Sequence, residues 1–75
     1  MIKEKIATSP VAKKRMDFYT ALKETSIGRK IRRIEWPSEE FGFIKDGLLM
    51  VFRNGVNHTW IISDGDMGAS DWITL

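Results

Sequence analysis

Apolar side chains recur at helical spacing directly after Asp17. Four residues share one face of this helix: Phe18, Ala21, Leu22 and Thr25. The Asp17 carboxylate can accept a backbone N–H of the first turn, and Gly28 can adopt the left-handed conformation that ends a helix. The pattern therefore predicts an amphipathic helix over residues 18–26, which is too short to persist in water without a surface to pack against.

After Gly28 the pattern changes to that of β-strands separated by turns. We expect strands at residues 30–36, 41–45, 48–53, 56–62 and 71–75. Asp46-Gly47 and Asn54-Gly55 favour two-residue hairpin turns, because such turns need two positive φ angles. Residues 37–40 form a turn, residues 63–70 a loop, and the last strand an edge. The sequence predicts an α+β fold, in which a short N-terminal helix packs on a four- to five-stranded antiparallel meander sheet.

Charge divides the chain unevenly. Residues 1–33 carry ten Lys or Arg against three acids, whereas residues 34–75 carry two against seven. Residues 1–15 show no sustained period, and we interpret them as a basic, loosely ordered N-terminal arm before a domain at residues 16–75. The asymmetry favours either an anion-binding face or complementary ends that meet in an oligomer.

The composition limits the classes of protein that are possible. A chain of 75 residues buries only roughly 60–65% of the surface that its unfolded form exposes, so oligomerisation is expected. The absence of cysteine excludes disulfides, thiolate zinc sites and cysteine nucleophiles, and it suits a reducing compartment such as cytoplasm. No apolar run reaches the roughly 20 residues of a membrane-spanning helix. The surplus of apolar side chains on the hairpin strands indicates burial between subunits. These residues are Phe41, Phe43, Leu48 and Phe52.

Two blocks of residues, one in each half of the chain, form a specific pattern. The first block has the pattern Met-Asp/Asn-Phe-x-x-Ala-Leu, followed by Gly-Lys/Arg-Lys-Val/Ile-Arg-Arg-x-x-Trp. It is carried here by Met16, Asp17, Phe18, Ala21, Leu22, Gly28, Lys30, Ile31, Arg32, Arg33 and Trp36. The second has the pattern Trp-x-x-Ser-x-x-Asp-Met-x-Ala-x-Asp-Trp. It is carried by Trp60, Ser63, Asp66, Met67, Ala69, Asp71 and Trp72. In order and internal spacing, the two blocks resemble the second Thoeris anti-defence family, whose members are small phage and prophage proteins.

This resemblance implies a nucleotide sponge that breaks no bond. Proteins of the family assemble as homo-oligomers, typically tetramers, and sequester the messengers of bacterial immune systems. The implied ligands are cyclic ADP-ribose isomers or the cyclic oligonucleotides of the cyclic-oligonucleotide-based defence. The resemblance further implies that the protein is phage-encoded and works in the host cytoplasm as a dimer or tetramer, without a membrane or a stable nucleic-acid partner.

The chemistry of a nucleotide site suggests seven ligand-binding residues: Arg32, Arg33, Trp36, Asn57, Trp60, Asp71 and Trp72. Each indole could stack on a purine, worth roughly 1–3 kcal/mol per base, but tryptophans equally build small cores. The two arginines could grip phosphate oxygens, and their adjacency on a strand sends them to opposite faces. Asp71 and Asn57 could bind ribose hydroxyls or an adenine amine, as could Asp66, although Asp66 equally suits a role in shaping the 63–70 loop.

Catalytic and metal sites are not indicated. His58 is the one histidine of the chain, and no metal-ligand spacing, nucleophile triad or glycine-rich phosphate loop accompanies it. We therefore expect no enzyme activity, no metal and no cofactor. The alternative hypothesis is a protein-interaction inhibitor of a host defence enzyme or toxin, which acts through the basic arm and hairpin edges. Single-strand nucleic-acid binding is a weaker third possibility, because the net charge is only +2.

Overall fold

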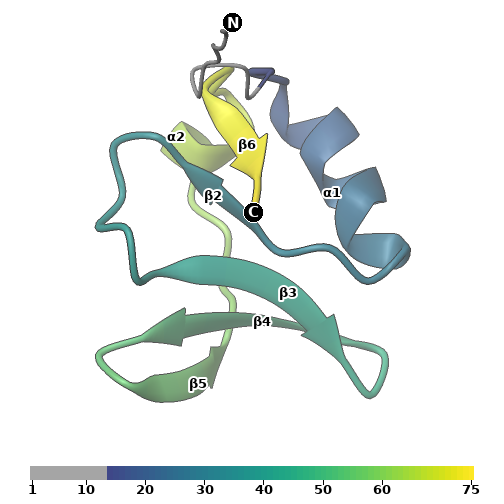
Figure 1. Ribbon diagram of the computed structural model, residues 1–75, viewed down its shortest axis with the longest axis vertical. Coiled ribbons are helices and arrows are strands. Elements are labelled where there is room, and N and C mark those ends of the chain that lie inside the picture. The colour runs from purple at the N-terminus through teal and green to yellow at the C-terminus, as the bar shows by residue number, and fades with distance from the viewer. Residues whose placement is uncertain (1–13) are drawn as a thin grey trace, which may run out of the picture.

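The computed structural model describes residues 14–75, and most of the predicted N-terminal arm lies outside this part of the chain. The elements follow in the order α1 (Phe18–Ser26), β2 (Ile31–Arg33), β3 (Phe41–Lys45), β4 (Leu48–Arg53), β5 (Val56–Thr59), α2 (Asp64–Met67) and β6 (Trp72–Thr74). Figure 1 shows α1 beside the β2 and β6 strands, with the β3–β4–β5 meander extending below them. The predicted α+β fold is confirmed.

The five strands form one antiparallel sheet in the order β5-β4-β3-β2-β6. Two hairpins connect β3, β4 and β5, and the central turn residues Asp46, Gly47, Asn54 and Gly55 all have positive φ angles of 53°, 79°, 54° and 76°. These values match the predicted turn chemistry. The chain then returns across the sheet, so that β6 pairs with β2 rather than with β5.

Local side-chain interactions define α1 as the sequence predicted. The Asp17 carboxylate accepts a hydrogen bond from the Thr20 backbone N–H at 2.8 Å, and hydrogen bonding to the side chain and the backbone of Thr20 lowers the pKa of Asp17. Gly28 follows the last turn with a φ of 92°. Phe18, Ala21 and Thr25 are buried, so the predicted apolar face is the one that packs on the sheet.

Three predicted strands are longer than the observed ones. The first covers Ile31–Arg33 rather than residues 30–36, because the chain turns at Ile34 and the Trp36 N–H donates to the Arg33 carbonyl at 3.1 Å. The fourth covers Val56–Thr59 rather than 56–62, and the last Trp72–Thr74 rather than 71–75. Single backbone hydrogen bonds continue just past these ends: the N–H groups of Ile34, Trp60 and Leu75 donate to the carbonyls of Asp71, Leu49 and Lys30 at 3.1, 3.2 and 2.9 Å.

The predicted loop at residues 63–70 contains a short helix, α2. Ser63 is its N-cap, and its hydroxyl accepts the Asp66 N–H at 3.1 Å. The α2 helix lies against α1 and next to Trp72. A serine followed three residues later by an acid was the available sequence signal for this helix.

The two faces of the sheet differ in their coverage. On the face that α1 covers, Trp60 packs directly on Gly42, which has no side chain to exclude the indole ring. The opposite face carries Phe41, Phe43, Met50 and Phe52, which the register places in two facing pairs. These four side chains are only half-buried, and none of the elements in residues 14–75 covers them.

Candidate functional site

The three tryptophans come together in one cluster. Trp60 and Trp72 have ring centres 5.6 Å apart, and Trp36 lies edge-on to both, at 5.6 Å and 5.2 Å. Phe18 of α1 closes the cluster at 5.3 Å from Trp72 and 6.0 Å from Trp60. Edge-to-face packing of this kind fills the space that a stacked base would need. The cluster is therefore the hydrophobic core of the domain.

Burial separates the roles of the three indoles. Trp72 is fully buried and Trp60 is 6% exposed, so the structure places both inside the protein rather than on a ligand-facing surface. The Trp72 Nε1–H donates to the Asp66 carbonyl at 3.1 Å, whereas the buried Trp60 Nε1–H has no hydrogen-bond partner among the described residues. Trp36 is half-buried, and the Arg53 guanidinium lies 4.9 Å from its ring centre.

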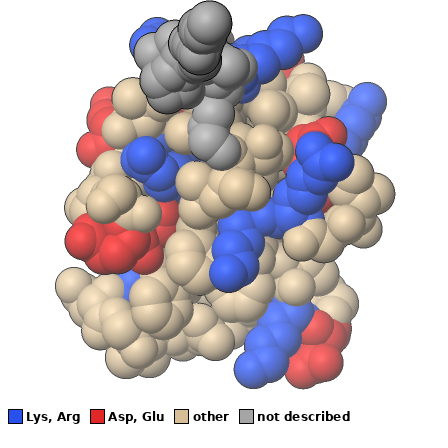
Figure 2. Space-filling model, viewed as in Figure 1, with Lys and Arg blue, Asp and Glu red and all other residues tan. Residues whose placement is uncertain are grey.

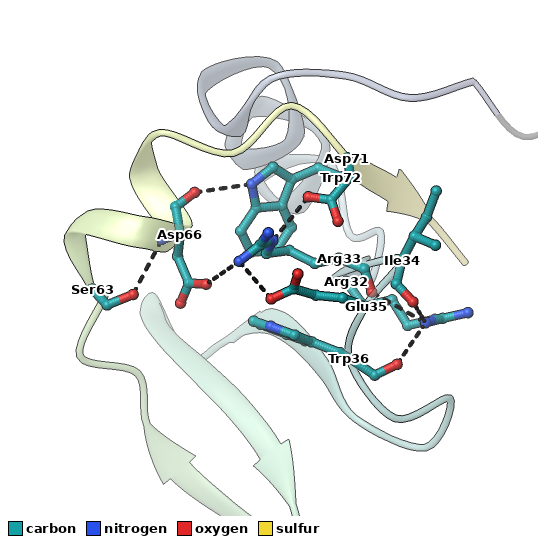
Figure 3. Close-up of polar contacts among 9 residues, drawn as sticks. All are labelled: Arg32, Arg33, Ile34, Glu35, Trp36, Ser63, Asp66, Asp71 and Trp72. Carbon is teal, nitrogen blue, oxygen red and sulfur yellow. Dashed lines mark hydrogen bonds and ion pairs between the residues drawn. The ribbon is translucent and has the colours of Figure 1, made fainter.

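Arg33 is surrounded by three carboxylates, as Figure 3 shows. Its Nε lies 2.8 Å from Oδ1 of Asp71. Its Nη1 lies 3.0 Å from Oε2 of Glu35 and 3.4 Å from Oδ1 of Asp66. The hydrogen bond from Arg33 to Asp71 raises the pKa of the guanidinium. Burial alone would raise the pKa of Asp71, but the hydrogen bond and the charge of Arg33 outweigh it and lower that pKa. This network holds the 34–36 turn against α2.

The Arg32 side chain points to the opposite side of β2 from Arg33 and donates hydrogen bonds to backbone carbonyls. Its Nη1 donates to the carbonyls of Arg33, Ile34 and Trp36 at 3.1, 3.4 and 3.1 Å (Figure 3). Its Nε is buried without a hydrogen-bond partner in the described part of the chain. The guanidinium therefore satisfies the carbonyls of the turn that ends β2.

The structure brings together five of the seven residues that the sequence suggested as ligand-binding. They are Arg33, Trp36, Trp60, Asp71 and Trp72. Arg32 lies beside this group and bonds to the Trp36 carbonyl. Asn57 lies apart, exposed on the edge strand β5 opposite Phe52. The five-residue group fills the junction of β2, β6 and α2, where Arg33 binds Asp71 and the three indoles pack on one another.

An open groove of about 790 Å³ lies elsewhere, and it contains none of the seven residues. It is lined by Gly28, Arg29, Lys30, Ser38, Glu39, Phe41, Phe52, Thr74 and Leu75. Sequence reasoning missed this site, although period-2 alternation could have placed Lys30 and Phe41 on one face of the sheet. A smaller hollow of about 310 Å³ lies beside the β4–β5 hairpin and is lined in part by His58, Arg53 and Trp60.

Residues 14–75 hold no group of three side chains with metal-binding character. In the same part of the chain no helix is long and apolar enough to cross a membrane. Comparison of the sequence with protein-family models and with curated proteins found no match to either.

Proposed function

We propose that this protein is a non-enzymatic anti-defence protein that binds and sequesters a nucleotide second messenger of a bacterial immune system. The messenger is a cyclic ADP-ribose isomer or a cyclic oligonucleotide, and its capture in the host cytoplasm keeps the effector inactive. The resemblance of both sequence blocks motivates this proposal. The observation that supports it is the groove of about 790 Å³, in which basic and aromatic side chains lie together.

The volume and chemistry of the groove suit a small anionic ligand. Sites for small molecules commonly enclose about 300–1,000 Å³ and combine apolar walls with a few polar groups. Two cations, Arg29 and Lys30, and two phenyl rings, Phe41 and Phe52, line this groove. Sequestration needs only tight binding, so a site without an acid–base pair or a metal is sufficient.

We further propose that the protein works as a homo-oligomer. Beside the groove, the sheet face that α1 leaves uncovered carries the half-buried Phe43 and Met50, and Leu48 is 62% exposed. A continuous apolar face on so small a domain is typical of an interface. A second copy of the chain would cover Phe43, Met50 and Leu48 and leave Phe41 and Phe52 open to the groove.

A thermal-shift screen tests the messenger proposal. The panel contains cyclic ADP-ribose isomers and cyclic di- and trinucleotides, each at about 100 times its Kd, where binding stabilises the fold by about 2.7 kcal/mol. For a domain of this size the expected rise in Tm is about 10–20 °C. Isothermal titration then gives stoichiometry. A flat panel from a folded protein would contradict the proposal.

Recovery of the ligand separates a sponge from an enzyme. After incubation the complex is heat-denatured and the released nucleotide is analysed by chromatography and mass spectrometry. We expect the same nucleotide, unchanged in mass and amount. A hydrolysed or rearranged product that accumulates with time would show that the protein is an enzyme.

Light scattering during size exclusion tests the oligomer. Leu48→Lys places a charge on the apolar face, and Ile61→Lys is the matched control because Ile61 is 89% exposed and lies after β5. We expect the wild type and Ile61→Lys to elute as the same oligomer and Leu48→Lys as a smaller species. A monomeric wild type would refute the homo-oligomer.

A further inference from the structure

The groove lies between two connections of the chain. Residues 28–30 lead from α1 into β2, and Ser38 and Glu39 precede β3. In Figure 1 these connections lie on opposite sides of β2, with β3 below and the end of β6 between them. Figure 2, in the same view, shows basic side chains across the centre, with acidic side chains at both the left and the right. The first connection brings Arg29 and Lys30 to the groove, and the second brings Glu39.

Two phenyl rings provide an aromatic surface in the groove. Phe41 of β3 and Phe52 of β4 are directly opposite in the antiparallel register. Their ring centres are 5.1 Å apart and their planes differ by 17°, so the rings are stacked. Both side chains are half-buried, which leaves part of this aromatic surface accessible to a planar ligand.

Lys30 rests on this aromatic surface. Its ammonium lies 4.6 Å from the centre of the Phe41 ring, and it has no carboxylate within ion-pair distance among residues 14–75. The neighbouring Arg29 binds Glu24 through one nitrogen at 3.0 Å, and its side chain is 57% exposed. Both cations can therefore donate hydrogen bonds to an anion that enters the groove.

A phosphate competes favourably for the Lys30 ammonium. A charge-assisted hydrogen bond to a phosphate oxygen is stronger than a cation–π contact at an exposed site. When Lys30 turns from the ring to a phosphate, it also frees the face of Phe41 for a planar base. One movement of one side chain thus prepares two contacts for a ligand that carries both groups.

The other polar residues determine the orientation of such a ligand. Glu39 repels a phosphate, whereas its carboxylate accepts hydrogen bonds from sugar hydroxyls, and Ser38 can donate or accept. We propose that the groove binds a nucleotide, with its phosphate on Lys30 and Arg29, its base on Phe41 and its ribose toward Glu39. This inference rests on the proposed function for the ligand class. It places the ligand in the groove rather than on the tryptophan cluster.

Chemical-shift mapping by NMR locates the ligand. The ¹⁵N-labelled full-length chain is titrated with cyclic di-AMP and any messenger from the thermal screen, and in parallel with millimolar AMP. We expect the largest amide shifts at residues 28–30, 38–41 and 52. The three tryptophan indole N–H signals report independently on the core, and those of Trp60 and Trp72 should stay in place. Largest shifts at these indoles or at Asp71 would overturn the inference.

Matched variants test the individual contacts. Lys30→Met keeps an apolar stem of similar length but removes the charge, and Lys23→Met is its control, because Lys23 lies over the exposed ring of Tyr19 on α1. We expect Lys30→Met to weaken nucleotide binding about tenfold or more and Lys23→Met less than about twofold. An equal effect of the two lysine variants would overturn the inference.

A second pair of variants tests the contact between the ligand base and Phe41. Phe41→Leu removes the ring of the groove, whereas Phe43→Leu removes a ring on the same sheet face that does not line it. We expect Phe41→Leu alone to weaken binding by about fivefold or more. NMR spectra of both variants show whether the fold is intact, and the lysine pair decides the question if Phe41→Leu unfolds.

The outcomes separate this inference from the proposed function. Messenger binding with shifts outside the groove would refute the groove and retain the sponge. Groove shifts with AMP beside a flat messenger panel would retain the groove and refute the sponge. No shift with any nucleotide would refute both.

Discussion

The contact between Gly42 and Trp60 yields a sharp prediction, because a single methyl group tests it. A Cβ added at Gly42 would lie 2.9 Å from Cε3 and 3.0 Å from Cη2 of Trp60, and closer still to Cζ3. Real Cβ atoms do not approach carbon this closely, so either the indole or the strand must move. Trp60 packs against Phe18, Trp36 and Trp72, which leaves the ring little room to move.

The expected cost follows from overpacking of a small core. Forcing an extra carbon into a well-packed interior costs about 1–3 kcal/mol. The lower flexibility of alanine in the unfolded chain returns about 0.4–1 kcal/mol. We expect Gly42→Ala to lower the free energy of unfolding by about 1–2 kcal/mol. A domain of this length has roughly 4–11 kcal/mol in total, so the loss is measurable.

Urea and thermal denaturation, followed by tryptophan fluorescence and circular dichroism, measure this loss. A fall in Tm of about 5–15 °C is expected for Gly42→Ala. Gly65→Ala is the control, because an added Cβ there meets only the Ser63 hydroxyl at 3.9 Å. Trp60→Phe in the Gly42→Ala background should recover part of the loss, since a smaller ring relieves the clash. Gly42→Ala with wild-type stability would refute this account of the core.

Two further predictions concern polar groups around the core. In urea denaturation, Trp72→Phe should lower the free energy of unfolding by about 1 kcal/mol more than Trp60→Phe. The reason is that only the Trp72 indole donates a hydrogen bond, to the Asp66 carbonyl of α2. Equal losses in the two variants would contradict this reasoning. Arg33→Met should lower stability at neutral pH by about 1.5–3 kcal/mol. The lowered pKa of Asp71 stabilises the fold above the ordinary carboxyl pKa of 3.8, and this contribution is lost as pH falls through the folded value. Between about pH 5 and about pH 2, the free energy of unfolding should therefore fall less in Arg33→Met than in the wild type. An equal fall in both proteins would exclude Asp71 as its source.

Local patterns in the sequence predicted the elements most reliably. The bounds of α1 match the prediction because its signals are local: an N-cap at Asp17, a periodic face and a glycine stop. The two hairpins were also predicted, since Asp-Gly and Asn-Gly adopt the required positive φ angles with little regard for the rest of the fold. The α2 helix was missed because one short turn carries almost no periodicity.

Whether a residue is available to a ligand depends on long-range contacts, which no local sequence pattern contains. Arg33 meets Asp71 across 38 positions of sequence, so an arginine that suited a phosphate is paired within the protein. Trp60 and Trp72 combine the properties of a stacking platform and of a core residue, and burial places them in the core. The proposed groove joins Lys30 to Phe41 and Phe52, which the prediction had assigned to a subunit interface.

The sequence by itself determined the α+β class, the helix and the hairpins, because these depend on residues within a few positions of one another. The tertiary structure decided which aromatic rings are buried, which cation is paired and where an open groove remains. The physical reason is that β6 returns to pair with β2. This pairing places the second tryptophan block against the first and fills the site that both blocks suggested, while Lys30 and Phe41 stay at an open surface.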